Sequence, residues 1–77
     1  MGTLTSKEQL YQYQWASDVE FDGIRLEVLS DSGQILFDVS VPEAGAITVN
    51  TFSNDVPASL IADAASIAER RTKPPAA

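Results

Sequence analysis

The sequence predicts an α+β protein, a small four-stranded antiparallel meander sheet with one C-terminal helix packed on one face. Apolar and polar residues alternate over most of residues 10–52, and the parity of the apolar positions reverses at turn-forming segments. An apolar stripe at helical spacing then follows residue 57. The 77 residues leave room for one domain. We expect it over residues 10–71, after a polar lead-in over 1–9 and before a disordered tail over 72–77.

The first expected strand carries three alternating aromatic side chains, Tyr11, Tyr13 and Trp15. Aromatic alternation favours a strand, although residues 5–8 also fit a capping box that would begin a short helix. The apolar residues change from odd-numbered to even-numbered positions at Asp22-Gly23. That dipeptide is typical of a two-residue type I′ hairpin turn, so the first hairpin is expected to close there.

Two further turns complete the meander. The apolar run over residues 24–28 is even-numbered, and the run over residues 35–41 is odd-numbered after the turn over 30–33. The expected register places Leu26 opposite Phe37, because a one-residue slip would put core residues opposite surface residues. A third turn over 42–45 leads to a strand over 46–52, whose expected register places Val39 opposite Val49.

The C-terminal helix is expected to begin after residues 54–57, with Asp55 as its N-cap and Pro57 in its first turn. Its apolar stripe faces the sheet and consists of Leu60, Ile61, Ala64, Ile67 and Ala68. Arg70 and Arg71 end the helix, where positive charge is favourable at the negative end of the dipole.

The charge and the missing residue types exclude several functions. The chain has 11 acidic and 5 basic residues, a net charge of −6, and neither His nor Cys. A disulfide framework, a thiolate zinc site and a histidine general base are therefore excluded. All eleven acidic residues lie within residues 8–69, where Arg25 is the single base, so this stretch carries −10. Direct nucleic-acid binding and an enzyme are both disfavoured.

Short motifs and targeting signals in the sequence give little further information about function. Residues 18–23 resemble the start of an EF-hand calcium loop. However, Glu20 occupies a position where the loop needs Asp or Asn, and Leu29 occupies the position of the bidentate Glu. No metal or other cofactor is therefore expected. Residues 1–6 match a myristoylation pattern without the polybasic second signal, and whether they are lipidated stays open. No apolar run reaches about 18 residues, the length of a membrane span. A cytoplasmic protein is expected.

The expected register places charged side chains on the outer face of the sheet. Arg25 would lie between Glu20 and Asp38, which is a stabilising charge row. Asp18 would instead face Glu27, and like charges directly opposite are destabilising. Leu36 and Phe52 would lie beside that acidic pair. An apolar centre with a charged rim is typical of an interaction patch, which gives a first set of partner-binding candidates, Asp18, Glu27, Leu36, Asp38 and Phe52.

Residues 10–15 would extend beyond the first hairpin. They either bend over the core, pair elsewhere in the sheet or form a short helix, or else they form an exposed edge for another chain. In the second case Tyr11, Tyr13 and Trp15 are also partner-binding candidates, because Tyr and Trp are frequent hot-spot residues. A homodimer through an edge strand remains an alternative.

The function expected from these features is that of a non-catalytic acidic interaction module. Its partner would be a protein with a basic surface, and in the most concrete form the chain inhibits that partner by occupying its nucleic-acid-binding surface. In size and acidity the chain is similar to small phage-encoded anti-defence proteins, including anti-CRISPR proteins, although no motif carries this class-level likeness. The alternatives are an immunity protein or antitoxin that neutralises a toxin, and an accessory subunit that binds by strand addition.

Overall fold

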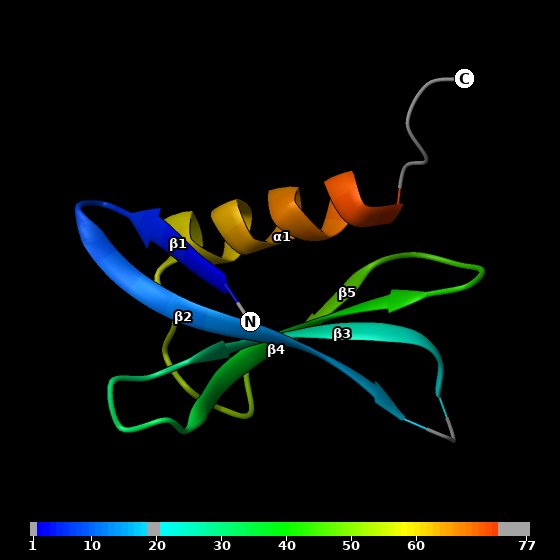
Figure 1. The fold of residues 1–77 in the computed structure, drawn as a ribbon, viewed down its shortest axis with the longest axis horizontal. Helices are drawn as coiled ribbons and strands as arrows, with labels where there is room; N and C mark the ends of the chain where they lie inside the picture. Colours follow the sequence, from blue (N-terminus) through cyan, green and yellow to red (C-terminus); the bar gives the residue numbers. More distant parts are fainter. Residues whose placement is uncertain (1, 19–20, 73–77) are drawn as a thin grey trace.

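A five-stranded antiparallel sheet with one helix over one face forms the protein, as seen in a computed structural model that describes residues 2–18 and 21–72 (Figure 1). The strands follow chain order across the sheet. The elements are β1 (Gly2–Ser6), β2 (Gln9–Asp18), β3 (Phe21–Leu29), β4 (Ile35–Pro42), β5 (Thr48–Asn50) and α1 (Ala58–Thr72). The α+β class and the antiparallel meander are confirmed, with five strands in place of four.

The additional strand is β1, which lies in the predicted polar lead-in. Leu4 is paired with Tyr11 and belongs to the buried core. Lys7 and Glu8, with φ values of 50° and 66°, connect β1 to β2. Two successive positive φ values are typical of a type I′ hairpin turn, so this segment is a turn and begins no helix. The strand was missed because Leu4 is its only large apolar side chain, and one residue establishes no alternation.

The predicted turn at Asp22-Gly23 is wrong, because both residues lie inside β3. Strand β2 ends at Asp18, and the two residues before Phe21 are outside the described part of the chain. Gly23 has a φ of 148° and pairs with Pro42. A Cβ atom at Gly23 would lie 2.1 Å from the backbone oxygen of Val41, so glycine is needed here for a close approach between strands.

The register between β3 and β4 differs from the prediction by two residues. Leu26 lies opposite Val39 instead of Phe37, and a bulge interrupts the pairing between Val28 and Leu29. A shift of two residues keeps the side chains of the regularly paired residues on their expected faces but changes their partners. The predicted pair Val39–Val49 is confirmed, although β5 is only three residues long.

Helix α1 covers the face of the sheet that carries Leu26, Phe37 and Val39 (Figure 1). Its predicted apolar stripe packs on that core, and its predicted end at Arg70 and Arg71 holds to within one residue. The Pro57 carbonyl accepts hydrogen bonds from the amides of Leu60 at 3.0 Å and Ile61 at 3.1 Å. Asp55 precedes Pro57 and is therefore not the N-cap. No helix within the described ranges has the length and apolar character needed to cross a membrane.

Candidate functional site

The face of the sheet opposite α1 is polar, and we call it the outer face. Because side chains alternate along each strand, residues that pair across the strands share a face. The first cross-strand row on the outer face is Gln14, Glu27, Asp38 and Asn50. A second row beside it consists of Ala16, Arg25, Ser40 and Thr48. The outer face therefore brings together the carboxylates of Glu27 and Asp38 and the guanidinium of Arg25, on neighbouring segments of β3 and β4.

Glu27 and Asp38 lie directly opposite each other on β3 and β4. Directly opposite residues of antiparallel strands have Cβ atoms about 4.5–5.5 Å apart, and two like charges at this spacing repel each other. Gln14 Nε2 donates a hydrogen bond of 2.7 Å to Glu27 Oε1 and thereby orients that carboxylate. This acidic pair is the most distinctive charge arrangement of the outer face.

Asp38 is the more constrained member of the pair, since only 6% of its surface is exposed. Ser40 Oγ donates to Asp38 Oδ1 at 3.4 Å, and Arg25 Nε donates to Ser40 Oγ at 3.3 Å. Burial raises the pKa of the Asp38 carboxyl above its ordinary value; the charge of Arg25 and the Ser40 hydrogen bond act in the opposite direction, whereas Glu27 raises the pKa further. The ionised carboxylate is thus held in an unfavourable environment.

The two other charge pairings expected on this face are wrong. Glu27 is paired with Gln14 and Asp38, so it does not face Asp18, whose backbone pairs with Phe21. Arg25 lies directly opposite Ala16 and Ser40 rather than Glu20 and Asp38, although its charge still acts on Asp38, which is its diagonal neighbour. Glu20 and the side chain of Asp18 lie outside what the structure describes. The Glu27–Asp38 pair could not be found from the sequence, because alternation with a period of two looks the same after a two-residue shift.

Leu36 does not form the apolar centre of an outer patch. It lies at the bulge of β4, packs against the core and lines a hollow of 270 Å³ together with Tyr11, Val56 and Leu60. Phe52 follows the end of β5, is 49% exposed and has a φ of 53°. The two residues are consequently not a cross-strand pair, and Phe52 alone remains as an exposed apolar candidate.

Tyr11, Tyr13 and Trp15 lie on an interior strand of the sheet and not at an exposed edge. Strand β2 pairs with β1 on one side and β3 on the other, and all three rings pack against the core. The rings of Tyr13 and Trp15 meet edge to face, with centroids 6.5 Å apart. Of the two alternatives for residues 10–15, pairing within the sheet is the observed one. The outermost strands are β1 and β5.

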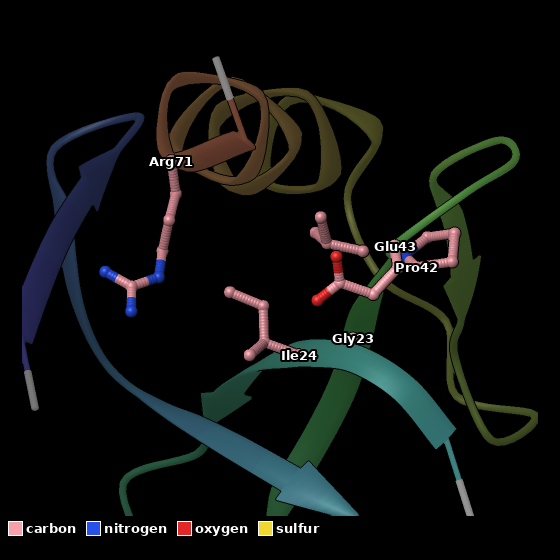
Figure 2. A pocket seen from close by; sticks show the side chains of 6 residues that line it. Gly23, Ile24, Pro42, Glu43 and Arg71 are labelled. Carbon is pink, nitrogen blue, oxygen red and sulfur yellow. The ribbon is translucent and has the colours of Figure 1, made fainter. Parts of the chain in front are cut away.

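The described residues contain no group of three or more acidic side chains that could hold a metal ion. A hollow of 380 Å³ lies on the helix side of the sheet and is lined by neither Glu27 nor Asp38 (Figure 2). Comparison of the chain with protein-family models, with curated proteins and with solved structures finds no match.

Proposed function

We propose that this protein is a non-catalytic interaction module whose outer sheet face binds a basic surface of a partner protein. The observation that carries the proposal is the opposition of Glu27 and Asp38 on the face that α1 leaves uncovered. Like charges placed opposite each other lower the stability of a sheet. Arg25 offsets part of this repulsion at the buried Asp38, and a basic partner would offset the repulsion further by binding at the partly exposed Glu27.

The charge of the whole chain supports the same partner chemistry. The net charge is −6, and of the five basic residues Arg25 alone belongs to the two rows of the outer face. A field of one sign accelerates encounter with a partner of the opposite sign. The partner we propose therefore carries a basic patch of lysine and arginine side chains.

In its most concrete form the module is an inhibitor that occupies a nucleic-acid-binding surface. Glu27 and Asp38 lie on neighbouring strands, about 4.8 Å apart, and form a small array of negative charge on the outer face. Such an array can take the place of phosphates on a basic surface. Anti-defence inhibition of a nucleic-acid-guided nuclease is one example of this mode, and neutralisation of a toxin by an immunity protein or antitoxin is another.

Neutralising the acidic pair tests this proposal. Wild type, Glu27→Gln/Asp38→Asn and the control Asp63→Asn/Glu69→Gln on α1 are used as bait in host lysate at about 50 mM and 500 mM salt. We expect nucleic-acid-binding proteins to be retained at low salt by wild type and by the control, but not by the outer-face variant. A retained protein should also release bound nucleic acid when the wild type is added. Equal retention by the two variants would contradict the proposal.

A second candidate function, strand addition, rests on the edge of β1. Gly2–Ser6 pairs with β2 on one side and contains neither proline nor a charged residue, the features that usually protect an edge. An accessory subunit or a second copy of the chain would bind here through backbone hydrogen bonds. Such binding would persist at 500 mM salt and be lost in Thr3→Lys/Thr5→Lys, which leaves the outer-face acids unchanged.

A further inference from the structure

The 380 Å³ hollow lies between the C-terminal end of α1 and the adjoining ends of β3 and β4 (Figure 2). Its volume lies within the range of about 300–1,000 Å³ that is typical of small-molecule sites. It is lined by Gly23, Ile24, Val41, Pro42, Glu43 and Arg71. Its lining therefore combines the apolar side chains of Ile24, Val41 and Pro42 with one residue of each charge.

The two charged residues come from different elements. Arg71 extends from the last turn of α1 toward the sheet, with its guanidinium carbon 4.7 Å from the ring centroid of Trp15. This cation–π contact restrains the side chain. Glu43 directly follows β4, and in Figure 2 its carboxylate projects toward the space above Ile24 from the side opposite Arg71. Within the described ranges no ion pair joins Arg71 to Glu43.

We propose that this hollow binds a small zwitterion with an apolar side chain, namely an apolar α-amino acid. The guanidinium of Arg71 presents paired N–H donors that fit the ligand carboxylate. The carboxylate of Glu43 accepts from the ligand ammonium group. The ligand side chain then packs on Ile24, Val41 and Pro42, where burial of apolar surface adds to the affinity. This site is on the helix side of the sheet and is independent of the function proposed for the outer face.

A titration with L-leucine and two blocked analogues tests the proposal on the full chain. We expect L-leucine to produce saturable NMR shifts of the Gly23, Ile24 and Glu43 amides and of the Trp15 indole. N-acetyl-leucine lacks the ammonium charge and leucinamide lacks the carboxylate. Each analogue should bind at least about tenfold more weakly, because each loses one of the two charge-assisted contacts.

A pair of variants tests whether Arg71 binds the ligand. Arg71→Gln should weaken L-leucine binding at least about tenfold, whereas Arg70→Gln, with the same change of charge one residue earlier, should bind as the wild type does. Absence of saturable shifts at millimolar L-leucine, or equal binding of the blocked analogues, would overturn the proposal. The analogue series needs no mutation and stays informative if Arg71→Gln is unstable. Because none of these measurements involves Glu27 or Asp38, failure here is distinguishable from failure of the outer-face function.

Discussion

Gly23 lies where the backbone of β4 passes close to β3, and its missing side chain is a structural requirement. An added Cβ would lie 2.1 Å from the Val41 oxygen and 2.7 Å from the Pro42 Cα, both of which are backbone atoms. We expect Gly23→Ala to lower the free energy of unfolding by about 2–4 kcal/mol, through a steric clash and an unfavourable φ. Urea unfolding of wild type and variant measures this change.

Gly33→Ala is the matched control for Gly23→Ala. Gly33 also has a positive φ, 85°, but a Cβ there would meet nothing within 4 Å. Its substitution should cost only the conformational strain, about 1–2 kcal/mol. Equal losses in the two variants would show that the close approach of β3 and β4 at Gly23 has no energetic importance.

Asp38 makes the stability of the protein depend on pH in an unusual direction for a carboxyl group. Its pKa is raised above the ordinary value of 3.8, so the folded protein binds the proton more tightly than the unfolded chain does. The stability contributed by Asp38 is therefore fully present below pH 3.8 and is lost as pH rises through the folded-state pKa. An asparagine at position 38 does not ionise, so its contribution to stability does not fall as the pH rises.

The Asp38→Asn variant isolates this effect. We expect its free energy of unfolding, relative to wild type, to increase between pH 3.5 and pH 7, because only the wild type ionises the buried group. Chemical denaturation at several pH values, with both proteins in the same buffers, gives the difference directly. A difference that is constant or decreases with pH would mean that Arg25 and Ser40 compensate fully for burial and for Glu27.

At the scale of elements, α1 packs on the sheet through an inward face that includes small residues. Ala64 and Ala68 are fully buried beside Leu60, which is 1% exposed. We expect Ala64→Leu to lower the free energy of unfolding by about 1–3 kcal/mol, since three added carbon atoms would push the helix away from the core. Thermal and urea unfolding both report the change.

Ala62→Leu is the control for the helix, because it adds the same volume on the exposed side of α1. Its effect should stay within about 0.5 kcal/mol. A loss in Ala62→Leu as large as that in Ala64→Leu would indicate a change in the helix itself rather than in its packing on the sheet.

At the scale of the whole molecule, the net charge of −6 implies self-repulsion that salt can screen. We expect the melting temperature to rise between about 10 mM and 500 mM sodium chloride. A gain of about 1 kcal/mol would correspond to a rise of roughly 4–8 °C for a domain of this size. Differential scanning fluorimetry over a salt series measures it, and a falling melting temperature would show that attractive pairs outweigh the net repulsion.

Much of the fold follows from local patterns of apolar and polar residues in the sequence. Alternation over two strands and the spacing of Leu60, Ala64 and Ala68 were sufficient to predict which side chains face the core. The third hairpin was correct in register, because a short turn between Val41 and Thr48 leaves few pairings. Residues 2–6 were missed as a strand because Leu4 alone establishes no period.

The identity of cross-strand neighbours was decided only by the tertiary structure. Strand alternation has a period of two, so it assigns Glu27 to the outer face but cannot distinguish pairings that differ by two residues. The bulge at Leu36 and the approach of β4 to Gly23 place Glu27 opposite Asp38. The sequence by itself thus determined the fold class, the faces and an acidic chain, whereas the tertiary packing decided which acids meet and where Arg71 and Glu43 lie.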